Sequence, residues 1–329
     1  MSNKSGSFAV IFCFVAAIAG WAGMPAAFAQ AYPSKVIRIV VPAGPGGTLD
    51  IMARVIGQRL AEIFKQPVIV DNRPGASGII GTTFLAKAPA DGYTLMIGSS
   101  TTHATNAAAY AKLPYDAVKD FAPVSNLADT TFLLCVHPST PVRTVKEFVA
   151  LAKARPGEVI YASFGQGGIA HFVTEAFALA AGIRMLHVPY KSGPDAAKAL
   201  VAGEAMASFD ALAVMLPHIN SGRVRPIAIG GAKRSAAAPD IPTFIEAGIP
   251  GYTANVWYAA FAPASTPADI VQKLNAEIVG IVQSPDMRVR LEGMGLQVIG
   301  STPEQLVALV RSDIDRYVRV AREANIRAD

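Results

Sequence analysis

The chain has 329 residues, enough for two domains, of which 52% are apolar and only 16% are charged. This composition excludes a disordered chain, which lacks the apolar surface that a core requires. The net charge is +5, but the basic residues are scattered, and the longest cluster is Lys233-Arg234. Because no basic stripe is present, we expect no nucleic-acid partner.

The first thirty residues have the pattern of an export signal. Lys4 precedes an apolar stretch over residues 8–24, and a small-residue cleavage site ends at Ala29. We therefore predict a cleaved signal peptide over residues 1–29; the alternative is an uncleaved anchor helix. Cleavage would leave Cys135 as the single cysteine, so no internal disulfide can form, and its apolar neighbours predict a buried strand thiol.

Strands and helices alternate after the signal. A β-branched run over residues 36–41 predicts a buried strand, and apolar residues at helical spacing over 49–63 predict a helix. A strand at 68–70, a helix at 79–88 and a strand at 93–97 follow. This βαβαβ order predicts a parallel sheet whose loops after the strands meet at one edge.

A second α/β unit follows the first. Its predicted strands are 132–136, 159–162, 185–188, 207–209 and 226–229, and its predicted helices are 145–154 and 169–181. After residues 257–261 the chain is predicted to be helical to its end. Thr266-Pro267 and Thr302-Pro303 predict helix starts, with the hydroxyl at the N-cap and proline at the first helical position. The predicted fold class is α/β with two lobes, and the C-terminal helices return to the first lobe.

Two glycine loops, residues 42–50 and 163–171, each join a strand to a helix. The N-terminus of a helix carries unpaired N–H groups and a partial positive charge. Glycine lets an anion approach that backbone, and Thr48 or Ser163 can add a hydroxyl donor. One such loop is an ordinary turn, whereas two, one in each lobe, predict an anion-binding cleft.

Nucleotide and catalytic sites find little support. Leu49 stands where a dinucleotide fingerprint needs its third glycine, although Asp71 is placed as a ribose-binding acid would be. The chain has no Gly-x-Ser-x-Gly or His-Glu-x-x-His motif, and its five histidines are never paired at metal-ligand spacing. We expect no cofactor and no metal; a Ser-His-Asp triad assembled in space stays open.

Short segments along the whole mature chain resemble one family, the Bug receptors, which are the substrate-binding receptors of tripartite tricarboxylate transporters. The segments are 32–35 (YPSK), 41–54, 71–76 (DNRPGA), 91–95 (DGYTL), 113–116 (LPYD), 187–191 (HVPYK) and 250–257. Single segments would be unspecific, but their combination in this order is highly specific. The resemblance implies a type II periplasmic binding-protein fold, with two α/β lobes that close on a ligand.

The resemblance also implies which residues bind a small carboxylate. They belong to the two glycine loops: Gly46, Gly47, Thr48, Asp50, Ser163, Gly165, Gly167, Gly168 and His171. Asp50 is an unusual neighbour for an anion. It either orients waters or accepts from a ligand amine or hydroxyl, or it only complements the helix dipole as a first-turn acid.

Further candidates follow other strands. We predict ligand contacts from Thr101 and Asp210, and leave open whether His103, Tyr190 and Trp257 touch the ligand. Two departures from the family pattern stand out. Residues 43–44 are Ala-Gly where the family has an aromatic residue and proline, which predicts a wider pocket, and residues 191–195 form a loop one residue shorter than expected.

The predicted protein is a monomeric periplasmic receptor, not an enzyme. Residues 30–130 with 255–329 form its first lobe, and residues 131–254 form its second. It captures a di- or tricarboxylate or an aromatic carboxylate and delivers it to integral membrane transporter subunits. The alternatives are a sensor accessory that presents its ligand to a signalling partner, and a secreted hydrolase.

Overall fold

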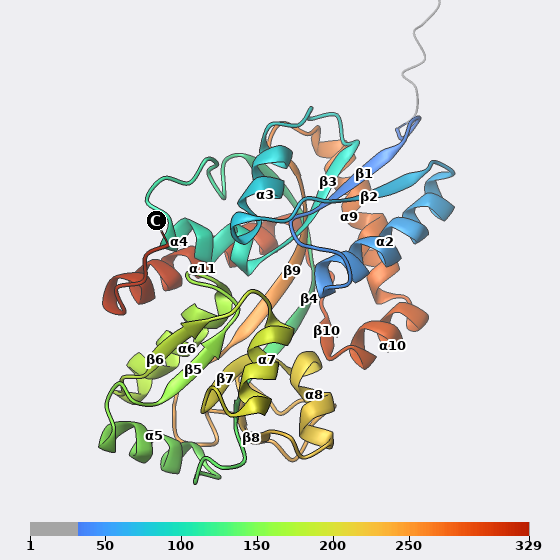
Figure 1. Cartoon of the computed structure of the whole chain (residues 1–329). Helices are drawn as coiled ribbons and strands as arrows, with labels where there is room; N and C mark the ends of the chain where they lie inside the picture. Colours follow the sequence, from blue (N-terminus) through green and yellow to red (C-terminus); the bar gives the residue numbers. More distant parts are fainter. Residues whose placement is uncertain (1–31, 329) are drawn as a thin grey trace, which may run out of the picture. The chain divides into compact units, whose positions relative to one another are not determined.

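A ten-stranded sheet forms the centre of the structure (Figure 1). The computed structural model describes residues 32–328, so the predicted signal peptide lies outside the described residues. Neighbouring strands follow the order β2-β1-β3-β9-β4-β7-β5-β6, and β10 and β8 both pair with β4. The strands are β1 (Ile37–Val41), β2 (Val68–Asn72), β3 (Thr94–Ser99), β4 (Phe121–Val136), β5 (Ile160–Ser163), β6 (Leu186–Pro189), β7 (Ala207–Ala211), β8 (Arg225–Ile229), β9 (Asn255–Pro263) and β10 (Leu296–Val298).

Helices connect and cover these strands. They are α2 (Thr48–Phe64), α3 (Ile79–Ala86), α4 (Asn106–Ala109), α5 (Val145–Ala154), α6 (Ile169–Ala181), α7 (Gly193–Ala202), α8 (Leu212–Asn220), α9 (Ala268–Gln283), α10 (Pro285–Gly293) and α11 (Pro303–Glu323), with two short turns, η1 (Ala76–Gly78) and η2 (Thr101–Thr105). All of these elements belong to one compact unit, Lys35–Asp329.

The first group of strands is parallel, as the βαβαβ pattern predicts. β1 lies between β2 and β3, with Arg38 opposite Ile69 on one side and Thr94 on the other. Helix α2 connects β1 to β2 and buries Met52, Ile56 and Leu60, which recur every four residues and therefore share one face. The predicted strand–helix–strand order of this region is confirmed.

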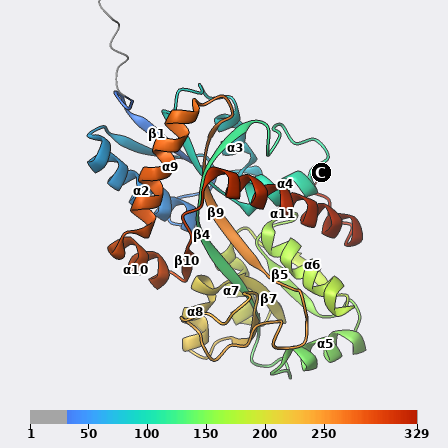
Figure 2. The same ribbon diagram turned by 180° about the vertical axis from the view of Figure 1, so that it is seen from behind.

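The second group is also parallel, but it runs the other way. β5 pairs with β6 and with β7 in parallel register, and β7 is antiparallel to β4. β4 and β9 are antiparallel to each other and link the two groups, as both views show (Figure 2). The lobe boundaries at 130/131 and 254/255 stay a prediction.

Strand β4 is longer than the sequence predicts. The apolar run indicates only residues 132–136, whereas β4 begins at Phe121. The first part contains Pro123 and several polar residues, and its pairing with β9 shifts at two irregularities, after Pro123 and after Asn126. These breaks destroy the regular alternation by which a strand is recognised in a sequence.

One of the two predicted C-terminal helix starts is confirmed. Thr302 caps α11, where its hydroxyl accepts from the Gln305 N–H and the Gln305 side chain accepts from the Thr302 N–H. The helix predicted after Thr266-Pro267, α9, is present but begins one residue later, at Ala268. The predicted cap is wrong, because the Thr266 hydroxyl donates to the Pro263 carbonyl at 2.7 Å. α9 packs on α2 and β4, and α11 packs on β4, η2, α4 and α6. That these helices return to the first lobe stays a prediction.

Cys135 lies in β4 with a free, fully buried thiol, as predicted. Burial raises the pKa of this thiol far above its usual value, so it stays protonated and unreactive. Among the described residues, no helix combines the length and the apolar character that crossing a bilayer requires.

Candidate functional site

The carboxyl ends of the two parallel strand groups point toward each other across β4. β3 ends at Ser99, which pairs with Tyr258 of β9, and Tyr258 pairs with Ala128 of β4. β7 approaches from the opposite direction and ends at Ala211, which pairs with Phe132. Four residues of β4 separate these two ends and span about 13 Å, so the loops that follow the two groups approach each other from opposite directions.

The first glycine loop continues β1 into this space. Gly46 has φ +85°, a conformation that favours glycine, and Gly47 is the N-cap of α2. A side chain at Gly44, Gly46 or Gly47 would meet no atom within 4 Å, so the loop has open space around it. No side chain caps α2, which leaves the amide groups of its first turn without an intrahelical acceptor.

Asp50 holds this loop together from inside. Its buried carboxylate accepts from the Gly46 N–H at 2.9 Å, from the Arg54 guanidinium at 3.0 and 2.9 Å, and from the Asn72 amide at 2.9 Å. Asn72 also donates to the Ala43 carbonyl at 3.1 Å. The bond from Arg54, with support from Gly46 and Asn72, lowers the pKa of Asp50 to about 2 despite burial. Both carboxylate oxygens are therefore occupied by the protein itself.

We expect Asp50→Ala to weaken ligand binding by at least about tenfold, because charged hydrogen bonds of this kind contribute about 1.5–3 kcal/mol each and here fix the loop. Isothermal titration with the carboxylate that binds wild type best measures the loss. Asp269→Ala is the matched control, since Asp269 is also a first-turn acid, on α9, but is exposed. Equal, small effects of both substitutions would show that Asp50 only complements its helix dipole.

The second glycine loop follows β5 in the same way. Gly168 is the N-cap of α6, again without a side-chain cap. Gly165 has φ +123°, and a side chain there would meet no atom within 4 Å. Gly167, with φ +68°, packs closely against Ala109 and Ala328. The loop therefore offers first-turn amide groups of α6 on the side of Gly165, while Gly167 anchors it.

Three stacked aromatic side chains support the second loop. His171 lies on His187 with ring centroids 3.9 Å apart, and His187 lies on Tyr161 at 4.9 Å. The Nδ1 atom of His171 accepts from the Gly167 N–H at 3.2 Å, and the Nε2 atom of His187 lies 2.6 Å from the Ser163 hydroxyl. Burial lowers the pKa of His171 to about 3 and that of His187 to about 4, so both rings are neutral near pH 7.

Asp210 lies at the end of β7 and is 2% exposed. Its Oδ1 accepts from the Ala211 N–H at 2.7 Å, while its Oδ2 is buried without a hydrogen-bond partner. Tyr258 of β9 connects this carboxyl to the first loop, because Tyr258 interacts electrostatically with Asp210 and forms a side-chain hydrogen bond with Thr48. Thr48 and Asp210, which are far apart in the chain, thus come together.

The loop after β3 is more tightly packed than the glycine loops. Thr101 is half-buried and its N–H donates to the Ser99 hydroxyl at 3.3 Å, while the neighbouring Ser100 hydroxyl is buried without a partner. His103 is fully buried and stacks on Phe261 with ring centroids 3.7 Å apart. His103 therefore forms part of the core here.

Two other open candidates have partners within the protein. Tyr190 is half-buried and its hydroxyl donates to Glu204 at 3.4 Å, and the indole of Trp257 is buried and donates to Asp313 at 2.8 Å. Tyr258 was not among the predicted site residues. Tyr258 lies where β9 passes the end of β3, a placement that depends on strand register and that the sequence alone does not display.

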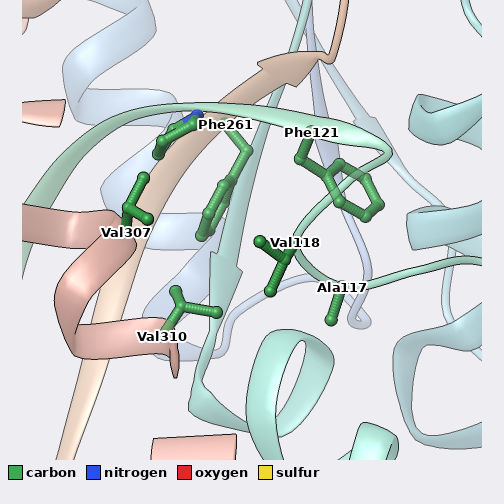
Figure 3. A pocket seen from close by; sticks show the side chains of 7 residues that line it. Ala117, Val118, Phe121, Phe261, Val307 and Val310 are labelled. Atoms are coloured by element: carbon green, nitrogen blue, oxygen red, sulfur yellow. The ribbon is translucent and has the colours of Figure 1, made fainter. Parts of the chain in front are cut away.

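The described residues contain no cluster of three or more metal-ligating side chains. Figure 3 shows a small apolar cavity of about 20 Å³ between the segment 117–123, β9 and α11. Phe121, Phe261, Val307 and Val310 line it, and no charged group does. A cavity of this size and polarity holds at most one water molecule and is no ligand site.

Comparison with known proteins places these features in a family. The profile described as "Tripartite tricarboxylate transporter family receptor" matches residues 52–326. The protein BugT of Bordetella pertussis is 36% identical over 327 residues, which cover 99% of each chain. The resemblance to Bug receptors is therefore confirmed.

Solved structures agree with this result. Rpa4515 of R. palustris, determined with adipate, has a TM-score of 0.82 and 36% identity over 90% of this chain and 99% of its own. MatC (Rpa3494) from Rhodopseudomonas palustris, determined with bound malate, has a TM-score of 0.79 and 32% identity over 88% of this chain and 99% of its own. These likenesses confirm the predicted fold class, a two-lobed binding protein.

Proposed function

Because the chain belongs to the tripartite tricarboxylate transporter receptor family, we propose that it is a periplasmic receptor that captures a small carboxylate between its two lobes. The proposed lobes are residues 30–130 with 255–329, and residues 131–254. The receptor then delivers its ligand to integral membrane transporter subunits and does not convert it chemically. The proposed signal peptide at residues 1–29 accounts for export.

One observation supports this proposal above the others, namely that two uncapped helix N-termini open toward the same stretch of β4. α2 begins after Gly47 and α6 after Gly168. The strands before these helices, β1 and β5, are parallel neighbours of β3 and β7, which end on opposite sides of residues 128–132. Amide groups at helix N-termini bind carboxylates by donated hydrogen bonds and a favourable dipole. A dicarboxylate would place one carboxylate at each loop.

The relatives and the loop geometry suggest the ligand class. Two solved relatives were determined with adipate and with malate, both dicarboxylates. In this chain the first loop has open space at Gly44, Gly46 and Gly47. Residues 44–47 are exposed, so no side chain of this part of the loop restricts the ligand, and the candidates include adipate and an aromatic carboxylate. Micromolar binding needs about 8 kcal/mol, which three or four charge-assisted hydrogen bonds and lobe closure can supply after the entropy of association is deducted.

Delivery requires that a partner distinguish the loaded receptor from the empty one. A ligand held by both loops stabilises the closed arrangement, because it makes its full set of contacts only there. The membrane subunits would then recognise the closed receptor, and the receptor acts as a monomer.

A thermal-shift screen of the purified exported protein tests the proposal. We expect adipate, malate or benzoate to raise the melting temperature, whereas adipamide and glucose have no effect. A ligand at 100 times its dissociation constant adds about 2.7 kcal/mol to the free energy of unfolding. Mass analysis after incubation should recover the ligand unchanged. Stabilisation by the neutral compounds alone, or turnover of the ligand, would contradict a carboxylate receptor.

A further inference from the structure

The carboxyl group of Asp210 has one oxygen that the protein does not satisfy. Oδ1 accepts from the Ala211 N–H at 2.7 Å, but Oδ2 has no partner and the residue is 2% exposed. A buried polar atom without a hydrogen bond is costly, and native proteins rarely leave one without a function. Oδ2 therefore needs a partner that only a bound state provides.

A glycine leaves room beside this oxygen. A side chain at Gly193, the first residue of α7, would place its first carbon 3.2 Å from Oδ2 and 3.6 Å from the ring of Phe164. Gly193 has no such carbon, and Phe164 belongs to the second glycine loop. Asp210 thus faces the loop that we propose to bind a carboxylate.

No charged side chain of the described residues pairs with Asp210. Cys135 of β4 and Tyr258 of β9 interact electrostatically with Asp210, and burial raises the pKa of both, to about 12 for Tyr258. From β5, Ser163 pairs with the neutral His187. The first turn of α7 contributes Asp195, which bonds to the Ser192 hydroxyl and lies near Lys198, and α8 has no acid in its first turn. The described neighbours therefore give the carboxylate of Asp210 no ion-pair partner.

We propose that Asp210 binds the ligand as a neutral acid, with its Oδ2–H donating a hydrogen bond to a ligand carboxylate. This inference rests on the proposed carboxylate receptor and adds that binding takes up one proton. The bond is of the short O–H···O⁻ type, which is about twice as strong as a neutral one. It provides the missing partner of Oδ2 and makes the site selective for an anionic ligand.

If Asp210 binds as a neutral acid, the affinity for the ligand must fall as the pH rises. Burial raises the pKa of Asp210 to about 7, although the Ala211 N–H opposes the rise. Below this value the acid is ready to donate; above it, binding must first add a proton. Because His171 and His187 have pKa values of about 3 and 4, they stay neutral over this range and do not contribute. The ligand carboxylates are ionised above about pH 6.

Isothermal titration of the wild-type exported protein with adipate and with malate, from pH 6 to pH 9, tests the inference. For the probe that binds, we expect the dissociation constant to rise about 100-fold over this range, with a slope of about tenfold per pH unit above pH 7. At pH 8, titrations in buffers of different ionisation enthalpy should show uptake of nearly one proton.

Two variants separate this role from a structural one. Asp210→Asn keeps a donor, so we expect its affinity to stay within about tenfold of wild type at pH 6 and to change less than about threefold up to pH 9. Gly193→Ala crowds Oδ2 and should weaken binding by about 10–100-fold at pH 6, the value of a charged hydrogen bond. Circular dichroism confirms that both variants fold.

The pH dependence of binding tests the role of Asp210, whereas binding itself tests the proposed carboxylate receptor. Binding that is independent of pH, or that strengthens as pH rises, would overturn the inference alone, as would an unchanged slope in Asp210→Asn. Binding that strengthens as the pH rises would mean that the ionised Asp210 accepts a hydrogen bond from a ligand amine or hydroxyl. Failure of both dicarboxylates to bind at any pH would contradict the proposed function, and the inference with it.

Discussion

Acidification from pH 7 to pH 5 should remove about 4 kcal/mol from the free energy of unfolding through two buried histidines that are held in their neutral form, of which proton uptake by Asp210 gives back about 2 kcal/mol. Burial lowers the pKa of His103 and of His171 to about 3. In the unfolded chain each imidazole has a pKa of about 6.5 and gains a proton as the pH falls below that value. The unfolded state then binds more protons than the folded state, so the free energy of unfolding decreases as the pH decreases.

The size of this loss in the free energy of unfolding follows from the difference between pH 5 and the pKa of histidine in the unfolded chain. Each histidine contributes about 2 kcal/mol at pH 5, and the loss continues to grow until the folded pKa near 3 is reached. His187, which is less buried, adds a smaller loss of the same sign. The free energy of unfolding of a domain is about 5–15 kcal/mol in total, and Asp210 offsets part of the histidine loss, so we expect acid unfolding at about pH 4 or below.

His103→Phe is the variant that tests this account. Phenylalanine keeps the stack on Phe261 and the edge contact with Phe121, which lies 4.6 Å away, but has no proton to gain. Acid titration followed by circular dichroism should place its unfolding midpoint lower than that of wild type. Phe261→Leu is the control, since it disrupts the same stack and keeps the histidine; it should lower stability equally at pH 7 and pH 5. A wild-type protein that is equally stable at both pH values would contradict the account.

Local sequence patterns predict the parts of this fold that depend on local physics. The run over 36–41 predicts β1 because β-branched residues suit a buried strand, and Thr302-Pro303 predicts the start of α11 because its cap is formed within four residues. Thr266-Pro267 has the same pattern, yet the helix starts one residue later, because the Thr266 hydroxyl donates to the Pro263 carbonyl in a competing local turn at the end of β9. A cap pattern cannot report such competition.

In the candidate site, too, local features are predictable from the sequence and tertiary contacts are not. The two glycine loops are recognisable because glycine between a strand and a helix is a local signal. The role of Asp50 depends on Asn72, which follows from the pairing of β1 with β2. The neighbourhood of Thr48, Tyr258 and Asp210 depends on three strands that are distant in sequence. Such contacts are set by register and packing, which a single sequence does not display.

Asp210→Asn should stabilise the empty protein by about 3–4 kcal/mol at pH 8. In wild type, burial raises the pKa of Asp210 from 3.8 to about 7, so between these values the folded state holds a proton that the unfolded state releases. Stability therefore falls as the pH rises from about 4 to 7 and then stays low, by about 1.4 kcal/mol for each unit of the shift. Asparagine has a similar shape and no such penalty.

Thermal unfolding at pH 8 and at pH 4.5–6 measures the effect, which should be a rise of several degrees at pH 8 that shrinks as the pH falls toward 4. Asp195→Asn is the matched control. Asp195 lies nearby in the first turn of α7 but accepts from the Ser192 hydroxyl, so its replacement should lower stability or leave it unchanged. A destabilised Asp210→Asn would show that the carboxyl has a partner in the empty protein. A stabilised variant that also loses the pH dependence of ligand binding would show that the protein keeps a costly buried acid because binding requires it.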